Sequence, residues 1–176
     1  RDLFVGGKDL ANDTYSLYQY AQSLYKAGNT EEALNEFKNL QQRFPNSEYA
    51  EGALFTIGWI RFQQGKFGEA ISNYKNVFSV YPNSSLAPVV YYSIGDAYFN
   101  MGKYDSANVN YQKVLENYPA SGFVFDAVNG LQYSYVAQGQ PDRAINLITE
   151  FVSKNPRLSF ADQILFKKGE IYYSQR

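Results

Sequence analysis

Carboxylates, lysines and tyrosines are the side chains on which any catalysis by this sequence would have to depend, because it contains no His and no Cys. The absence of Cys also excludes disulfides, thiol nucleophiles and thiolate metal sites. The sequence has no phosphate-binding glycine loop and no constellation of metal ligands. These observations argue against an enzyme, and we expect neither a cofactor nor a metal ion.

The charged residues argue against a nucleic-acid partner. Lys and Arg total 16 and Asp and Glu total 17, so the formal net charge is −1. The basic residues are scattered, and only Lys167 and Lys168 are adjacent, so the chain lacks a basic stripe. No apolar run reaches the roughly 18 residues that a membrane-spanning helix needs. We therefore expect no nucleic-acid binding and no direct membrane insertion.

Three residue types recur along the chain with one common period of 37 residues. The residues that keep this step are Gly28, Gly65, Gly102 and Gly139, then Ala33, Ala70, Ala107 and Ala144, and also Pro45, Pro82, Pro119 and Pro156. Such self-similarity is typical of proteins that stack one small structural unit many times. The sequence therefore predicts four copies of one unit.

Each copy is predicted to contain two helices. In the third copy Tyr91, Ile94, Gly95 and Tyr98 have the i, i+3, i+4, i+7 spacing of an amphipathic helix. Gly102 follows this stripe and is expected to end the helix, because a helix C-terminus favours a residue that tolerates the left-handed conformation. A second helix then runs to the Pro of the repeat. We expect a helical hairpin in every repeat.

Two further columns concern capping and packing. Ser47, Ser84 and Ser121 each follow a repeat Pro by two residues and are expected to cap the next first helix, and Pro141 is expected in the first turn of a second helix. Small residues that let two helices approach closely occupy the column Ala21, Gly58, Gly95 and Gly169. Gln132 interrupts this column, so we expect the fourth hairpin to pack less tightly.

The order Tyr91-x2-Ile94-Gly95-x2-Tyr98, Ala107-x3-Tyr111 and Pro119 resembles the tetratricopeptide repeat (TPR) pattern, lengthened by three residues beyond its usual 34. The resemblance implies an all-α fold, a right-handed α-solenoid of helical hairpins with four full repeats and the first helix of a fifth. The expected boundaries are residues 14–50, 51–87, 88–124, 125–161 and the partial repeat 162–176. Residues 1–13 fit no repeat, and Gly6-Gly7 suggests a flexible lead-in.

The junctions Pro45–Ala50 and Pro82–Ala87 read Pro-Asn-Ser-x-x-Ala and are similar to those of TPR arrays in bacterial envelope proteins. Two such groups are the periplasmic coordinator associated with Tol–Pal and the TPR lipoprotein of outer-membrane barrel assembly. This similarity implies a bacterial periplasmic or cell-envelope location, with the cytoplasm as the alternative. Because a solenoid normally needs a polar cap, we expect the natural protein to continue past Arg176. The uncapped last helix also suggests self-association.

In a TPR solenoid the first helices line the concave face, and the resemblance therefore implies a groove there. The residues expected to bind a partner in this groove are Tyr15, Tyr18, Tyr25, Phe55, Trp59, Phe62, Tyr92, Asp96, Phe99, Asn129 and Tyr133. An exposed aromatic patch usually marks an interaction surface, and Trp and Tyr are favoured anchors. The first hypothesis is thus a non-catalytic scaffold that binds a partner peptide or helix. The alternative interpretation of these aromatics is that they pack against neighbouring repeats or against a missing segment.

Other functions of the same groove stay open. Aromatic faces stack on sugar rings, so a glycan- or peptidoglycan-binding module that also uses Asp96, Asp126 and Asn129 is the second hypothesis. Asp96 and Asp126 are also the only carboxylate pair that the groove brings near one another, which is little support for an enzyme. TPR co-chaperones that bind acidic C-terminal tails use Lys, Arg and Asn at these positions. Aromatic and acidic residues stand there in this sequence, so that role is not expected.

Overall fold

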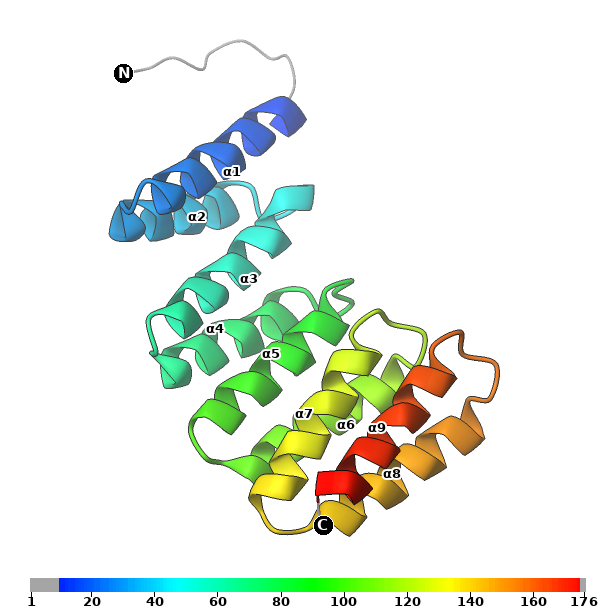
Figure 1. Ribbon diagram of the computed structural model, residues 1–176. Coiled ribbons are helices and arrows are strands. Elements are labelled where there is room, and N and C mark those ends of the chain that lie inside the picture. Colours follow the sequence, from blue (N-terminus) through cyan, green and yellow to red (C-terminus); the bar gives the residue numbers. More distant parts are fainter. Residues whose placement is uncertain (1–9, 175–176) are drawn as a thin grey trace. The chain divides into compact units, whose positions relative to one another are not determined.

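The computed structural model describes the backbone of residues 10–174 and the side chains of residues 13–166, 168–170 and 173. This part of the chain forms nine α-helices and no strand (Figure 1). The helices are α1 (Leu10–Lys26), α2 (Thr30–Arg43), α3 (Glu48–Gln63), α4 (Phe67–Val80), α5 (Ala87–Asn100), α6 (Tyr104–Asn117), α7 (Val124–Ala137), α8 (Pro141–Lys154) and α9 (Ala161–Ser174). The all-α fold that the periodicity predicts is confirmed.

The repeat glycines and prolines act as predicted. Gly28, Gly65, Gly102 and Gly139 have φ of 86°, 71°, 69° and 68° and form the turn inside each hairpin. A side chain would be strained in this left-handed conformation, which explains why only Gly stands there. The second helices α2, α4, α6 and α8 each end two residues before the Pro of the repeat, because the residue that precedes a Pro avoids helical backbone. Pro141 is the first residue of α8, as expected.

The first helices differ from the prediction at their N-termini. α1 begins at Leu10, inside the predicted lead-in, and α3 begins at Glu48. The expected Ser caps are also wrong. Ser47 precedes α3 but its hydroxyl makes no capping bond, whereas the hydroxyls of Ser84 and Ser121 accept bonds from the N–H groups two residues on, at 3.0 and 3.2 Å. These serines stabilise the turns that lead into α5 and α7, which begin three residues later.

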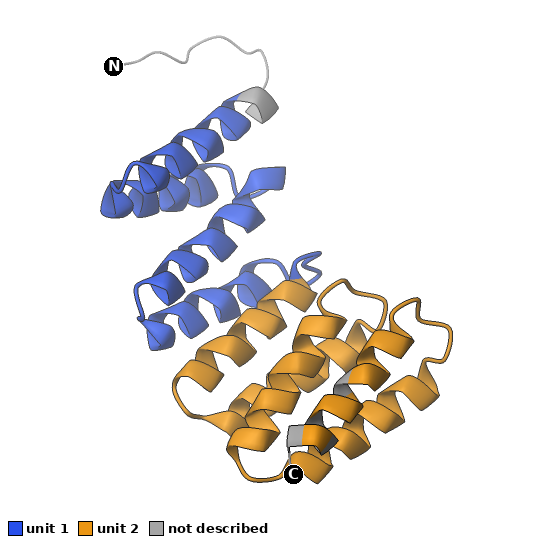
Figure 2. Ribbon diagram, in the orientation of Figure 1, with its two compact units in different colours: residues 1–86 blue, residues 87–176 orange. Residues whose placement is uncertain are grey.

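The chain divides into two compact units, residues 1–86 and residues 87–176 (Figure 2). In unit 1, α3 packs against α1 and α2, and α4 packs against α3. In unit 2, α5, α7 and α9 lie side by side as one layer, and α6 and α8 form the layer behind them (Figure 1). Within each unit, successive helices contact one another, and α1 and α3, α5 and α7, and α7 and α9 are also in contact. This is the packing of a stacked repeat.

Glycines of the first helices pack against tyrosine rings of the second helices. A Cβ added to Gly58 would lie 2.6 Å from the ring of Tyr74, and one added to Gly95 would lie 2.5 Å from the ring of Tyr111. Both rings are almost completely buried, so no room remains for a side chain opposite them. The small-residue column therefore exists because each ring occupies the space that a side chain would need.

The last two positions of this column, residues 132 and 169, differ from those of Gly58 and Gly95. Gln132 takes the glycine position in α7 and is buried, and its side-chain oxygen has no hydrogen-bond partner. The α7–α8 hairpin packs less closely than the α5–α6 hairpin, as predicted. Gly169 in α9 is exposed, and no described atom lies within 4 Å of the place where its Cβ would be. The α3–α4 and α5–α6 hairpins, in which a tyrosine ring faces a glycine, are thus packed more closely than the α7–α8 hairpin.

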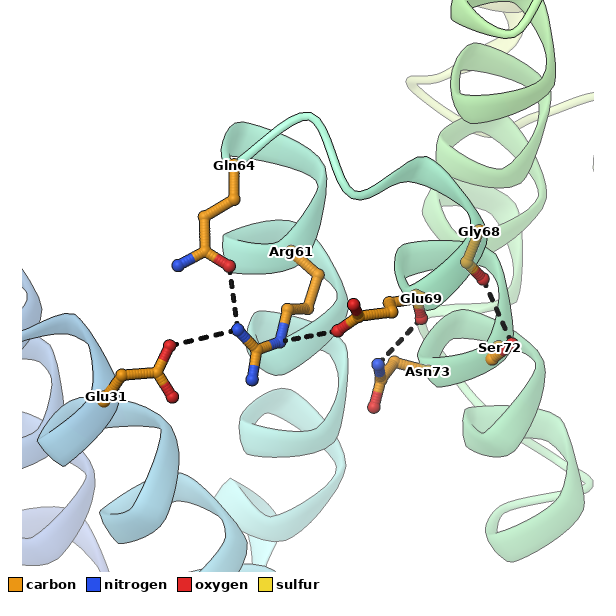
Figure 3. Close-up of polar contacts among 7 residues, drawn as sticks. All are labelled: Glu31, Arg61, Gln64, Gly68, Glu69, Ser72 and Asn73. Atoms are coloured by element: carbon orange, nitrogen blue, oxygen red, sulfur yellow. Dashed lines mark hydrogen bonds and ion pairs between the residues drawn. The ribbon is translucent and has the colours of Figure 1, made fainter.

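Arg61 connects three helices of unit 1 (Figure 3). Its Nη1 atom donates to Oε1 of Glu31 on α2 at 3.1 Å and to Oε1 of Gln64 at 2.8 Å. Its Nε atom lies 3.3 Å from Oε2 of Glu69 on α4. The Arg61 side chain is only 13% exposed, although the two acids remain mostly exposed. This network joins the first hairpin to the second, and Arg61 stands at the repeat position that Tyr98 holds in the third copy.

Candidate functional site

The unit 1 face consists of the predicted groove residues on α1 and α3. Its members are Tyr15, Tyr18, Tyr25, Phe55, Trp59 and Phe62. Tyr15 is 48% exposed and Trp59 is 38% exposed, whereas the other four side chains are half-buried. Large aromatic side chains that remain this open in a helical array are candidates for contacts with a partner. Tyr15 and Trp59 are therefore the open positions of the unit 1 face.

Aromatic contacts make this face continuous from α1 to α3. The rings of Tyr25 and Trp59 meet edge to face with 5.4 Å between their centroids. Tyr49 of α3 contacts both Tyr15 and Tyr18, with centroid separations of 5.5 and 5.7 Å. These contacts hold the open rings in place before any partner arrives, and a preorganised side chain loses little entropy on binding.

Phe55 and Phe62 have a larger role in the fold of unit 1. The ring of Phe55 packs on buried Tyr74 of α4 at 5.4 Å, and that of Phe62 packs on Phe67 at 5.3 Å. Tyr18 likewise packs edge-on against buried Phe37 of α2 at 5.4 Å. For these residues, packing against the second helices accounts for much of their position.

The unit 2 face consists of Tyr92, Asp96 and Phe99 on α5 and of Asn129 and Tyr133 on α7. Tyr133 is 57% exposed, and the other four side chains are half-buried. The Tyr92 ring stacks on Phe123 at 5.9 Å and also contacts Tyr111. Phe99 packs on Tyr104 at 5.4 Å. The unit 2 face is therefore more polar and more closely packed than the unit 1 face.

A carboxylate lies at the centre of the unit 2 face. The hydroxyl of Tyr111 donates a 2.6 Å hydrogen bond to Oδ1 of Asp96, and the Tyr92 hydroxyl lies near enough to this carboxyl to act on its pKa. Burial raises the pKa of Asp96, which the two tyrosine hydroxyls oppose and the charge of Asp126 reinforces. Burial together with the Asp96 charge also raises the pKa of both tyrosines. The group is thus a desolvated carboxylate with a second acid near it.

Helix α7 passes over this carboxylate. A Cβ added to Gly130 would lie 2.5 Å from Cζ of Tyr111, the ring carbon that bears the hydroxyl bound to Asp96. Asp126, Asn129 and Tyr133 have the i, i+3, i+7 spacing and share one side of α7. The side-chain oxygen of Asn129 is buried and has no hydrogen-bond partner. Asp126 lies near enough for its charge to help raise the pKa of Asp96, which agrees with the expectation that the two carboxylates approach one another.

Three residues outside the predicted groove contribute to these faces. Tyr111 is a position of the repeat pattern and was not expected in the groove, yet its hydroxyl holds Asp96. Tyr49 and Phe123 were not assigned to the groove, although they contact its tyrosines. The one available signal was that Tyr111 and Asp96 occur in the same repeat, where a phenol and an acid can pair. Tyr49 and Phe123 stand just before or at the start of a helix, where the repeat pattern constrains residue type least.

The described residues form neither a metal site nor a membrane-spanning helix. Among the described side chains, no three acidic residues are grouped so as to hold a metal ion. Of the described helices, none is both long and apolar enough to cross a membrane. The site geometry consequently consists of two aromatic faces, one of which contains a buried carboxylate.

Comparison with known proteins identifies the family. One tetratricopeptide repeat model matches residues 15–47, 52–84 and 90–121, and a second tetratricopeptide repeat model matches residues 133–176. The chain belongs to the tetratricopeptide repeat family. Together the two models match most of the chain. No curated protein sequence matches this TPR chain.

Solved structures show the same fold. The MamA RS-1 ArsTM double mutant is 18% identical with a TM-score of 0.63, and the match covers 95% of this TPR chain and 98% of that chain. MamA 41-end from Desulfovibrio magneticus RS-1 is 20% identical with a TM-score of 0.61, covering 93% and 97%. A putative kinesin light chain with TPR-like repeats from Podosopora anserina is 13% identical with a TM-score of 0.62, covering 96% and 98%. At these identities the likeness concerns the TPR fold alone.

Proposed function

We propose that this TPR protein is a non-catalytic scaffold that binds a partner peptide or helix on its aromatic faces, in a bacterial cell-envelope assembly. The observation that carries the proposal is the 38% exposure of Trp59 while Tyr25 holds its ring edge-on. An indole that is open and yet fixed in place loses little entropy when a partner covers it. TPR repeats are typical of protein-interaction scaffolds, which supports the same class.

The shape of the unit 1 face favours a peptide or helix as its occupant. Two ring contacts connect α1 to α3 on this face, one between Tyr15 and Tyr49 and the other between Tyr25 and Trp59. Such a surface presents apolar anchors at intervals, which suits the side chains that project from an extended segment or from one side of a helix. The envelope location rests on the Pro-Asn-Ser junctions of the sequence and is part of the proposal.

Glycan binding is the second candidate function. It is favoured by the combination of an open ring, Tyr133, with polar groups of Asp126 and Asn129 on the same side of α7. A sugar ring could stack on such a tyrosine while its hydroxyls bond to the polar groups. The unit 1 face has no such polar groups among its six members, which is why the scaffold is preferred.

The test is affinity capture from an envelope extract of the source organism, with bound proteins identified by mass spectrometry. Wild type is compared with the Tyr15→Ala/Trp59→Ala variant and with Tyr20→Ala. Tyr20 is 53% exposed but lies on another side of α1, so it controls for the loss of any exposed aromatic ring. We expect a protein that the wild type and Tyr20→Ala retain and the double variant loses, while circular dichroism shows unchanged helicity.

The captured protein is then purified and titrated against each variant. A dissociation constant that rises about tenfold or more for the double variant alone supports the scaffold, since one or two hot-spot rings account for such a change. Equal capture by all three proteins contradicts the proposal for the unit 1 face. Soluble peptidoglycan fragments are titrated in parallel, with Trp59 and tyrosine fluorescence as reporters, and saturable binding of these fragments alone favours the glycan function.

A further inference from the structure

We propose that the chain associates head to tail, with α9 of one copy bound in a cleft between α1 and α2 of a second copy. The α1–α2 cleft is lined by apolar and charged side chains, among them Asp13, Leu17, Tyr20, Glu36, Arg43 and Phe44. The α9 face consists of Phe166, Gly169 and Tyr173. Neither surface belongs to the unit 1 face or the unit 2 face, so this association is separate from partner binding.

The α1–α2 cleft lies where later repeats pack against a preceding second helix. Tyr20 on α1 occupies the repeat column of Ile57 on α3 and Leu131 on α7. Ile57 is 2% exposed and Leu131 is 1% exposed, whereas Tyr20 is 53% exposed. All three helices contact their own second helix, but α3 also packs against α2 and α7 against α6, and no described helix precedes α1. The cleft therefore continues an interface of the repeat and is suited to another helix.

The composition of the cleft favours a protein segment as its occupant. The cleft has a volume of about 400 Å³. Leu17 and Phe44 are half-buried there, and the guanidinium of Arg43 lies over the Phe44 ring, with 5.2 Å between Cζ and the ring centroid. Tyr and Arg are enriched in protein interfaces and among their hot spots. The open ring of Tyr20 is thus the expected anchor.

Helix α9 has room for such a ring. The ring of Tyr74 on α4 fills the space at Gly58, and the ring of Tyr111 on α6 fills the space at Gly95. Gly169 of α9 holds the same repeat column, but no described atom lies within 4 Å of the place where its Cβ would be. The α9 face can therefore accept an aromatic ring from another molecule.

The residues beside Gly169 give α9 the pattern of a helix that binds in a cleft. Phe166, Gly169 and Tyr173 have the i, i+3, i+7 spacing and share one side of the helix. Phe166 is 69% exposed and Tyr173 is 82% exposed. Apolar anchors at this spacing are typical of helices that bind in grooves. Tyr20 of one copy then fills the space at Gly169 of the other, and the two α9 rings pack beside it.

The two surfaces complement one another better than either complements itself. The α1–α2 cleft lacks a covering helix, and the α9 face lacks a ring. Two α9 faces in contact would leave Tyr20 exposed, and their glycines would meet no second-helix ring. A contact between different surfaces is heterologous, so each copy in a pair keeps one surface free for a further copy.

Two complementary variants of the full chain test the inference by sedimentation velocity. Tyr20→Glu places a charge in the cleft, and Phe166→Ser/Tyr173→Ser removes the rings of α9. Tyr15→Glu is the matched control, because Tyr15 is 48% exposed on another side of the same helix. All the substituted side chains are exposed, so circular dichroism should show unchanged helicity.

We expect the average mass of wild type and of Tyr15→Glu to rise between about 5 and about 500 μM. The dissociation constant should be about tenfold higher or more for Tyr20→Glu and for Phe166→Ser/Tyr173→Ser, as one hot-spot ring provides. An equimolar mixture of these two variants should form a dimer and nothing larger. One variant supplies an intact cleft and the other an intact α9, so the mixture restores a single contact.

Three results would overturn the head-to-tail contact. The first is association of Tyr20→Glu as strong as that of wild type, which would indicate that two α9 faces pair. The second is a mixture of the two variants that does not pair. The third is a wild type that stays monomeric over the whole range. Partner capture through Trp59 depends on none of these results, so the proposed function would stand in each case.

Discussion

The hydroxyl of Tyr111 on α6 donates a 2.6 Å hydrogen bond to Asp96 on α5, and its ring lies against backbone of both α5 and α7 at two glycines. One side chain therefore connects three helices of unit 2. The ring fills the space at Gly95 and Gly130, and the hydroxyl reaches past them to the face where Asp96 lies. Tyr111 thus belongs both to the packing between helices and to the candidate site. A substitution at Gly95 or Gly130 should therefore affect the packing of its ring and also its hydrogen bond to Asp96.

Gly95→Ala should destabilise the protein. The added Cβ would lie 2.5 Å from the Tyr111 ring, which is buried and cannot move aside freely. We expect the free energy of unfolding to fall by about 1–3 kcal/mol, the usual cost of overpacking. Urea unfolding followed by circular dichroism measures the change.

Gly169→Ala is the matched control for this substitution. Gly169 occupies the same repeat column, but no described atom lies within 4 Å of its Cβ position. Alanine is the better helix former, so stability should stay unchanged or rise by about 0.5–1 kcal/mol. If both substitutions destabilise equally, the tyrosine ring is not the reason for the glycine column.

Asp96→Asn should change how stability depends on pH. Burial raises the pKa of Asp96 above its ordinary value of 3.8, so the folded protein holds this proton more tightly than the unfolded chain does. Stability from this group is therefore highest at acidic pH and is lost as pH rises through the unfolded and then the folded pKa. The amide cannot ionise, so the stability of Asp96→Asn relative to wild type should increase between pH 3 and pH 7.

Urea midpoints at half-unit pH steps give this difference directly. Because all other acidic residues are common to both proteins, their titration cancels in the comparison. A difference that stays constant with pH, or that decreases, would contradict the assignment of Asp96 as a desolvated carboxylate.

Arg61→Ala should cost more stability than the loss of either acid that it binds. Its side chain is only 13% exposed and contacts Glu31 and Glu69, so the substitution removes packing as well as two ion pairs. We expect a loss of about 1–2 kcal/mol, against about 0.5 kcal/mol for Glu31→Gln or Glu69→Gln. Thermal unfolding in 0.05 M and 0.5 M NaCl checks the charge contribution, which salt should weaken.

The exposed pair Glu150 and Lys154 is the comparison for the Arg61 network. These side chains are 64% and 70% exposed and lie one turn apart on α8, with 2.6 Å between the charged atoms. Lys154→Ala should cost no more than about 0.5 kcal/mol. An Arg61→Ala effect as small as this one would show that the network adds little to the connection between the first two hairpins.

The exposed rings of α9 should promote self-association. Phe166 is 69% exposed and Tyr173 is 82% exposed, and Leu165 beside Phe166 is 41% exposed. Apolar surface of this kind is costly in water, so association that covers it is favoured. The average mass measured by sedimentation velocity should rise as the protein concentration rises from about 5 to about 500 μM. This range is chosen because weak pairing gives dissociation constants of about that order.

The variant Phe166→Ser/Tyr173→Ser should remain monomeric over the same concentrations. Tyr15→Ser, which removes an open ring from α1 instead, should associate as the wild type does. Equal association of all three proteins would place the contact elsewhere on the chain.

The sequence predicted the hairpins well because their determinants are local and repeated. Gly102 and Pro119 act through their own backbone geometry, so each repeat signals its turn and its end independently. The positions of the small-residue column were also predicted, because Gly weakens a helix and is expected inside one only where another side chain packs closely against it, as at Gly58 and Gly95.

The sequence did not predict the interactions that occur once. The Arg61 network joins residues 30 positions apart through side-chain geometry that no repeat column announces. The predicted capping bond of Ser47 does not form, because the start of a helix depends on the conformation of the whole preceding turn and not on the presence of one hydroxyl. Likewise, residue type alone could not separate open Trp59 from half-buried Phe55, because both are aromatic and lie one turn apart on α3. Partner binding by either residue stays a prediction.

The neighbour-to-neighbour packing within each unit has a consequence for kinetics. In the part of the chain that the structure describes, the closely packed helices are adjacent or next-but-one in the sequence, so few contacts require distant segments to meet. Low contact order of this kind speeds folding, and a stacked array can start to fold at any hairpin and propagate outward. Amide hydrogens should accordingly exchange fastest in α1 and α9 and slowest near buried Tyr74 and Tyr111.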